Sequence, residues 1–148
     1  MMDEPTLERW LIRAETLCKT RGVRLTQHRR TVLQLLCRSP KPLSAYELLA
    51  QMKNKIDKAA PPTIYRALEF LQQQGLAHKL ESIHAYVGCS HPDHPHDGQF
   101  LICSDCGDVS EVEDQQVTNS LDAASKAAGF QADRPIVELV GTCAKCGK

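Results

Sequence analysis

Two closely spaced cysteine pairs carry the strongest chemical signal in this sequence of 148 residues. They are Cys103-x2-Cys106 and Cys143-x2-Cys146, and a glycine follows each pair. Each pair can supply two thiolates from one tight turn, and two such turns complete the tetrahedral coordination that Zn²⁺ adopts in structural sites. A catalytic zinc needs an open coordination position, and four cysteines leave none. The pattern therefore predicts a structural zinc.

The 36 residues between the pairs exceed the roughly 15–20 residues of a usual zinc ribbon. Their pattern predicts a small α/β unit. VSEV (109–112) and IVELV (136–140) are typical of strands, and residues 114–129 are typical of a capped helix. The alternative is two redox or disulfide pairs. The N-terminus MMDEPTLERW lacks a secretory pattern, so we expect a cytoplasmic protein, in which disulfides are rare.

A second group of possible metal ligands gathers in the middle of the chain, together with several carboxylates. Its members are His78, His84, Cys89, His91, His94 and His96. Each histidine alone is more often a surface residue, and Cys89 alone is more often a small buried apolar residue. Their crowding near the polar stretch CSHPDHPHDGQ (89–99) favours a metal that takes ligands from both sides of a hinge. Such a metal would act as a switch by biasing one of two domain arrangements.

The charge distribution changes at the same place. The whole chain carries 18 basic and 18 acidic residues, a formal charge of zero. Residues 1–84 hold 14 basic and 8 acidic residues, or +6, whereas residues 85–148 hold 4 and 10, or −6. A basic module of this kind can neutralise phosphates and release counterions, as nucleic-acid binding requires. No stretch approaches 18 consecutive apolar residues, so the sequence predicts no membrane span.

The basic module is predicted to form helices followed by a hairpin. Apolar residues recur at helical spacing, and each predicted helix has a start or stop signal. The signals are Gly22 after the first helix, Thr26 and Ser44 as N-caps, Pro61-Pro62 in a first turn, and Gly75 as a stop. Tyr46 is expected to add apolar surface to the third helix. LAHKLES (76–82) and HAYVGC (84–89) then alternate, which indicates a β-hairpin and a winged helix-turn-helix domain.

The start of the fourth predicted helix has the residues of a recognition helix. With its apolar residues facing inward, Thr63, Tyr65 and Arg66 lie on or near the outer face of the first turn. That end of the helix reaches base edges in helix-turn-helix proteins. Three more basic residues can contact phosphate or a minor groove: Arg24, Arg29 and Arg30. The alternative is a solvated helix face in a small domain with no DNA role.

Several motifs together resemble a known family. They are GVRLTQHR (22–29), PPTIYRALEFLQQQGLAHKLES (61–82), YVGC (86–89), FLICSDCG (100–107) and GTCAKCG (141–147). In this order, and along nearly the whole chain, they resemble the ferric uptake regulator family, and most of all its zinc uptake regulators. Motifs of this length and order are specific, so the resemblance carries expectations about fold, partners and site residues.

The resemblance implies an α+β fold. A winged-helix DNA-binding domain would span residues 1–89, a hinge 90–98, and a zinc-stapled α/β dimerisation domain 99–148. It implies a zinc-dependent transcriptional repressor that binds palindromic double-stranded operator DNA as a homodimer and represses zinc-acquisition genes when zinc is sufficient. It implies no catalysis, no small-molecule substrate and no membrane. The alternative is an iron- or peroxide-responsive regulator of the same family.

The resemblance also implies two Zn²⁺ sites per subunit. The four paired cysteines match the structural site of the family. The regulatory site of zinc-sensing members uses two histidines, a cysteine and a glutamate, which fall here on His78, Cys89, His96 and Glu111. Iron-sensing members carry an HHDH-like run where this chain has CSHPDHPHD (89–97), and a thiolate at Cys89 favours zinc over iron because softer ligands suit zinc.

Two further assignments follow from the positions that match the family. His91 or His94 can replace His96 or help to form an extra site, because both lie between the inferred ligands. Tyr65 and Arg66 match the family's base-contacting positions, and Arg24 matches its minor-groove basic position. Thr63 is included among the predicted DNA contacts because it lies on the first turn of the same predicted helix.

Three other classes of protein compete with this interpretation. A thiol- or peroxide-based sensor would use Cys89 or the cysteine pairs. A zinc deaminase would need H-x-E followed by P-C-x-x-C, and no proline directly precedes Cys103. A zinc buffer that does not bind DNA would leave the +6 module without a use.

Overall fold

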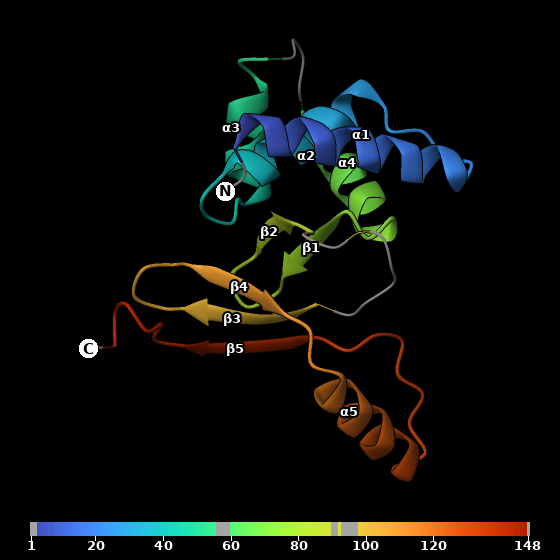
Figure 1. The fold of residues 1–148 in the computed structure, drawn as a ribbon, viewed down its shortest axis with the longest axis vertical. Helices are drawn as coiled ribbons and strands as arrows, with labels where there is room; N and C mark the ends of the chain where they lie inside the picture. The colour runs from blue at the N-terminus through green and yellow to red at the C-terminus, as the bar shows by residue number, and fades with distance from the viewer. Residues whose placement is uncertain (1–2, 56–59, 90–91, 93–97, 148) are drawn as a thin grey trace. The chain divides into compact units, whose positions relative to one another are not determined.

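The chain folds as two separate units, Met1–His94 and Pro95–Lys148. The computed structural model describes residues 3–55, 60–89, 92 and 98–147. The first unit contains α1 (Glu4–Thr20), α2 (Gln27–Arg38), α3 (Ala45–Met52), α4 (Pro61–Gln73), β1 (Ala77–Leu80) and β2 (Ala85–Gly88) (Figure 1). The second contains β3 (Gln99–Cys103), β4 (Val109–Val112), α5 (Gln115–Ala127) and β5 (Val137–Gly141). The predicted α+β class is confirmed.

Local capping explains where the first three helices begin. The side chains of Asp3, Thr26 and Ser44 accept hydrogen bonds from the first turns of α1, α2 and α3. Ser44 forms a full capping box, since the Glu47 side chain also accepts from the Ser44 N–H at 3.1 Å. The caps at Thr26 and Ser44 are therefore confirmed. Because each cap satisfies backbone N–H groups that lack a helical partner, the helix starts are set locally.

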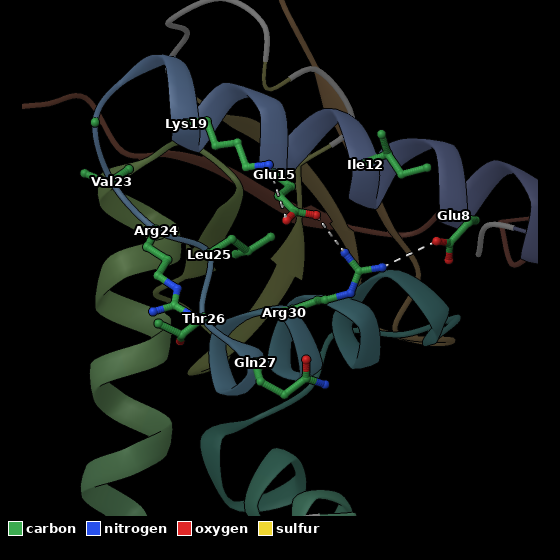
Figure 2. A pocket seen from close by; sticks show the side chains of 11 residues that line it. Glu8, Ile12, Glu15, Lys19, Val23, Arg24, Leu25, Thr26, Gln27 and Arg30 are labelled. Carbon is green, nitrogen blue, oxygen red and sulfur yellow. Dashed lines mark hydrogen bonds and ion pairs between the residues drawn. The ribbon is translucent and has the colours of Figure 1, made fainter.

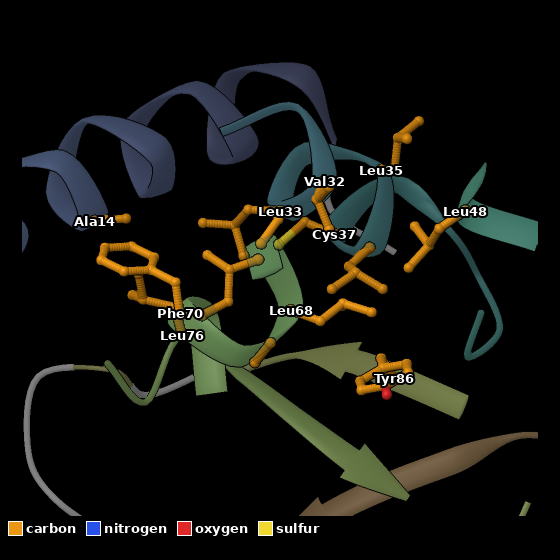
Figure 3. Packing of buried hydrophobic residues seen from close by; sticks show 14 of the residues in the cluster. Ala14, Val32, Leu33, Leu35, Cys37, Leu48, Leu68, Phe70, Leu76 and Tyr86 are labelled. Atoms are coloured by element: carbon orange, nitrogen blue, oxygen red, sulfur yellow. The ribbon is translucent and has the colours of Figure 1, made fainter. Parts of the chain in front are cut away.

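The first unit has a continuous apolar core. Figure 3 shows side chains from α1, α2, α4 and the hairpin converging, among them Leu33, Leu68, Phe70 and Tyr86. α2 packs against both α1 and α4, and α4 packs against α3 and β1. Leu33 and Leu68 are 0% and 1% exposed, so they bury close to their whole apolar surface. This core holds α4, which carries the residues predicted to contact DNA, against its neighbouring helices α2 and α3.

Tyr46 is the exception, because its side chain is 82% exposed. The prediction that it adds apolar surface to the core side of α3 is wrong. Leu48 and Met52 are one helical turn apart and both fully buried, so they define the inner face of this eight-residue helix. Tyr46 lies two positions before Leu48, roughly 200° away around the helix, and so points outward.

The predicted hairpin is confirmed as β1 and β2, which pair antiparallel with His78 opposite Val87 and Leu80 opposite Ala85. Tyr86 also bridges Leu43, which ties the hairpin to the segment before α3. A Cβ at Gly88 would lie 2.7 Å from the sulfur of Cys37, so only glycine fits between β2 and α2. The hairpin is thus fastened to the helical core.

The second unit is a three-stranded sheet in the order β4-β3-β5, with β3 antiparallel to β4 and parallel to β5. The predicted strands at 109–112 and 136–140 and the predicted helix capped by Asp114 are confirmed, with β5 one residue later. The central strand β3 was not predicted. The buried Gln99 side chain donates to the Asp114 carbonyl at 3.0 Å and accepts from its N–H at 3.1 Å, which joins β3 to the start of α5.

Among the described residues, no helix combines the length and apolar character of a membrane crossing. The expected partition into 1–89, 90–98 and 99–148 stays a prediction, because most of residues 90–98 lie outside the described part of the chain.

Candidate metal and DNA-binding sites

The four paired cysteines come together because β3 and β5 are parallel. Cys103 ends β3 and lies opposite Gly141, the last residue of β5, so both cysteine turns leave the same edge of the sheet. Each turn closes on itself, with the Gly107 N–H donating to the Cys103 carbonyl and the Gly147 N–H to the Cys143 carbonyl, both at 2.9 Å. The four sulfur atoms all lie within 4.8 Å of one another. The structure therefore assembles the predicted four-thiol group.

The sulfur geometry fits a zinc ion. The sulfurs of Cys106 and Cys143 are 3.8 Å apart, and a tetrahedral site with Zn–S bonds of about 2.3 Å has sulfur–sulfur edges of about 3.8 Å. A disulfide needs a sulfur–sulfur distance of about 2.0 Å, and all seven cysteines are free thiols. The donor set and its spacing suit Zn²⁺ better than a redox pair.

Backbone N–H groups aim at one of these sulfurs. The N–H groups of Cys106 and Cys143 donate to the Cys103 sulfur at 3.5 Å and 3.3 Å, and they lower the pKa of that thiol to about 6. The pKa of Cys146 is raised to about 12, chiefly by its hydrogen bond with the Cys143 thiol. The backbone thus favours the thiolate form of Cys103, which is the form that binds a metal ion.

Ser104 contributes to this site although sequence reasoning missed it. Its N–H and its hydroxyl both donate to the Gly141 carbonyl, at 2.8 Å and 3.0 Å. These two bonds tie the turn after β3 directly to the end of β5. A serine directly after the first cysteine of a pair is the available signal, since serine hydroxyls often bond nearby backbone groups.

The hairpin brings His78 and Cys89 together. His78 lies on β1, and Cys89 follows β2 with its N–H donating to the Leu76 carbonyl at 2.9 Å. A ligand atom of His78 and the Cys89 sulfur lie within 4.8 Å of each other, and Cys89 is buried. Two of the four predicted regulatory ligands thus lie side by side in the first unit.

The other predicted ligands lie elsewhere in the chain. Glu111 is on β4 of the second unit, opposite Phe100. His91, His94 and His96 lie outside the described residues. His84, also a possible ligand by its position, is exposed in the turn between β1 and β2 and has a φ of 49°.

The start of α4 has the predicted outer face. Ile64 and Leu68 are buried, whereas Tyr65 is 56% exposed, Arg66 is exposed and Thr63 is half-buried. The Thr63 N–H donates to the Ala60 carbonyl at 2.9 Å, so the first turn is formed although Ala60 provides no side-chain cap. Polar and aromatic side chains are therefore displayed on the turn that would meet DNA.

The three arginines before and within α2 differ in their surroundings. The Arg29 guanidinium lies 3.8 Å from the centre of the Phe70 ring and donates to the Arg24 carbonyl at 2.7 Å. Figure 2 shows Arg30 between Glu8 and Glu15, with ion pairs of 3.5 Å and 3.6 Å. Arg29 and Arg30 therefore contact neighbouring helices of the first unit. Their phosphate contacts, considered from sequence, stay a prediction. Arg24 is exposed on the connection between α1 and α2.

Comparison with known proteins yields a consistent set of similarities. The sequence pattern of the ferric uptake regulator family matches residues 20–139. The chain is 38% identical over 146 residues to the zinc uptake regulation protein of Escherichia coli (strain K12), across 98% of this chain and 85% of that protein. A solved zinc uptake regulator complexed with zinc and DNA has a TM-score of 0.92 at 38% identity, covering 95% of this chain and 94% of its own.

The crystal structure of holo XcZur is similar as well, with a TM-score of 0.86 at 44% identity over 93% of this chain and 96% of that one. Relatives with other named roles are more distant. The peroxide operon regulator of Bacillus subtilis (strain 168) is 26% identical over 140 residues.

Proposed function

Because the chain belongs to the ferric uptake regulator family, we propose that it is a zinc-dependent transcriptional repressor. It binds palindromic operator DNA as a homodimer when zinc is sufficient, and it represses zinc-acquisition genes. The observation that carries the proposal is the pairing of a four-thiol group with a separate His78–Cys89 pair on the hairpin that follows α4. The first suits a permanent metal, and the second lies in the unit that carries the recognition helix.

The four-thiol group is the structural zinc site. Zinc bound there supplies the positive charge that keeps Cys103, Cys106, Cys143 and Cys146 deprotonated. The residues of the chain do the rest: the N–H groups of Cys106 and Cys143 orient the Cys103 sulfur, and Ser104 ties the two turns together. The two cysteine turns, at the ends of β3 and β5, are thereby linked to each other.

The regulatory zinc site consists of His78, Cys89, His96 and Glu111, which makes two Zn²⁺ sites per subunit. A set with one thiolate, imidazoles and a carboxylate suits zinc better than iron. The ligands come from both units of the chain, so the bound metal restrains their mutual arrangement. His91 or His94 can replace His96 as the ligand, because both lie between Cys89 and His96 in the sequence.

The first unit reads the operator. Thr63, Tyr65 and Arg66 reach base edges from the start of α4, and Arg24 contacts the minor groove or phosphate. The charge of +6 over residues 1–84 supports this role.

The second unit supports the homodimer. It exposes large apolar side chains, which typically mark an interface with another chain: Leu121, Phe130, Ile136, Leu139 and Val140. Two recognition helices held by such a dimer fit half-sites one helical turn or a multiple apart. The protein acts in the cytoplasm and neither catalyses a reaction nor takes a small-molecule substrate.

The test is a DNA selection followed by a metal titration. The full chain selects duplexes from a random-sequence pool with free zinc in excess, and binding of a selected duplex is then measured against buffered free Zn²⁺, Fe²⁺, Mn²⁺ and Ni²⁺. We expect a palindromic consensus and the tightest metal response for zinc. Cys89→Ser should leave a folded dimer whose weakened DNA binding no longer depends on zinc. An unchanged zinc response in this variant contradicts the regulatory site.

The same assay separates the alternatives. An iron-responsive regulator would answer to Fe²⁺ at lower free concentration than to Zn²⁺. A peroxide or thiol sensor would release the duplex on addition of hydrogen peroxide at constant zinc, with oxidised cysteine detected by mass spectrometry. A zinc buffer would select no DNA.

A further inference from the structure

Arg21 joins the ends of three segments in the first unit. It is the C-cap of α1. Its guanidinium donates through Nη1 to the Gln74 carbonyl at 2.6 Å and through Nη2 to the Pro92 carbonyl at 3.4 Å. Gln74 is the C-cap of α4, and Pro92 lies three residues after Cys89. One side chain therefore connects the end of the recognition helix to the chain that leaves the hairpin.

Arginine is suited to this position by shape and by charge. Its planar guanidinium presents several N–H donors in a fixed fork, so it can bond two carbonyls in different directions at once. The carbonyls at the C-terminal ends of α1 and α4 carry partial negative charge, which a cation stabilises. Hydrogen bonds from a charged donor are also stronger than neutral ones. A lysine at residue 21 would keep the charge and lose the fork.

A second tie holds the other end of the same segment. The Cys89 N–H donates to the Leu76 carbonyl at 2.9 Å, and Gln74, Gly75 and Leu76 form the turn after α4. Residues 89 and 92 are thus both bonded to this turn, the first through its N–H and the second through Arg21. The Cys89 bond does not depend on Arg21, so loss of Arg21 removes the tie at Pro92 and leaves the tie at Cys89 in place.

We propose that Arg21 is a positioning residue for the zinc response. By holding the Pro92 carbonyl against the end of α4, it fixes the position of Pro92, three residues after the ligand Cys89, and couples that position to the recognition helix. This inference rests on the proposed function, since it concerns the regulatory site. Arg21 touches neither the zinc ligands nor DNA in this role.

The test compares Arg21→Gln with Lys19→Gln in the full chain. Lys19 lies on the same helix end, is exposed, and pairs only loosely with Glu15 at 4.0 Å, so its replacement removes the same charge and leaves the bridge intact. For each variant, zinc content, thermal unfolding and binding of the selected duplex across buffered free zinc are measured. In Arg21→Gln we expect the zinc concentration for half-maximal DNA binding to rise roughly threefold to tenfold relative to Lys19→Gln. One tightly held zinc and the DNA affinity at excess zinc should be unchanged.

Three outcomes overturn the proposal. If the two zinc titrations coincide, Arg21 does not position the regulatory site. If DNA affinity at excess zinc falls in Arg21→Gln alone, the residue acts on the DNA-binding unit itself. If the wild-type chain binds the duplex without any dependence on zinc, the proposed function fails and this inference with it, and that result is visible before any variant is made.

Arg21→Lys keeps the test decisive if Arg21→Gln does not fold. The lysine retains the charge at the two helix ends but lacks the planar fork that fits both carbonyls, so its zinc titration should shift in the same direction by a smaller factor. A titration that coincides with wild type overturns the role of the bridge.

Discussion

The two units of this chain are stabilised in different ways. In the first, buried leucines from several helices form one core, and Leu33 and Leu68 are 0% and 1% exposed. In the second, Phe130 and Leu139 are 66% and 64% exposed, and no residue of α5, which the structure describes in full, is buried. A unit as short as Pro95–Lys148 buries a small fraction of its apolar surface, so its stability alone is marginal. We therefore expect the second unit to depend on the proposed metal and on a partner chain, and the first to depend on its own packing.

The largest expected effect comes from removing the proposed structural zinc. Cys103→Ser, or chelation of the metal from the full chain, should unfold the second unit, because a structural zinc contributes on the order of 10 kcal/mol. Hydrogen exchange read by mass spectrometry should show β3 and β5 losing protection while α2 and α4 keep theirs. Persistent protection of β3 and β5 after the metal has been lost would mean that this sheet is stable without it.

The next effect concerns the core of the first unit. Leu68→Ala should lower its free energy of unfolding by about 2–5 kcal/mol, because it leaves a cavity in a closely packed core. Denaturant unfolding can be followed by fluorescence of Trp10, the sole tryptophan of the chain, which lies in this core. The matched control is Leu139→Ala, which should leave the Trp10 transition unchanged and weaken the dimer in sedimentation. Equal shifts for the two variants would remove the distinction between the units.

A smaller effect is expected where the hairpin meets α2. Gly88→Ala should cost about 1–3 kcal/mol, because its new methyl group would lie 2.7 Å from the Cys37 sulfur. Gly141→Ala, in β5, meets nothing within 4 Å and is the matched control. Adding Cys37→Ala to Gly88→Ala should recover part of the loss in a double-mutant cycle. If the two changes are simply additive, the close approach of Cys37 and Gly88 is not the cause.

The effect expected to be smallest at neutral pH is a pH dependence within the first unit, which develops only above pH 9. Burial raises the pKa of Cys37 from 9.0 to about 12, so the folded chain keeps this proton at pH values where the unfolded chain loses it. Stability from this group is complete below pH 9 and falls between pH 9 and 12, by at most roughly 1.4 kcal/mol per pH unit. Between pH 9 and 12, the free energy of unfolding of the wild type should fall relative to that of Cys37→Ala. A constant difference would show that the thiol titrates alike in both states.

Most elements of both units could be predicted from local patterns, because their boundaries depend on neighbouring residues. Thr26, Ser44 and Asp114 cap helices through hydrogen bonds that span two or three residues. Gly22 and Gly75 follow helices with φ values of 74° and 70°, which other residues rarely adopt. These signals need no knowledge of tertiary structure.

Local patterns were insufficient where distant parts of the chain decide the outcome. β3 is the central strand, and four of its five residues are buried, on both faces of the sheet. It therefore lacks the alternation that identified the other strands. Arg29 and Arg30 belong to a basic module that suggests DNA contacts, and their partners Phe70, Glu8 and Glu15 lie far away in sequence. Their charge alone could not reveal these contacts with neighbouring helices.

The sequence by itself determined the types and spacing of the chemical groups: two cysteine pairs, a histidine and a cysteine at the hairpin, and a basic helix start at Tyr65 and Arg66. Only the tertiary structure decided which groups meet. The parallel pairing of β3 and β5 brings Cys103 and Cys143 to one edge, and the antiparallel pairing of β1 and β2 brings His78 near Cys89. The reason is that spacing along a chain limits local geometry, whereas contact between distant residues depends on strand direction and register.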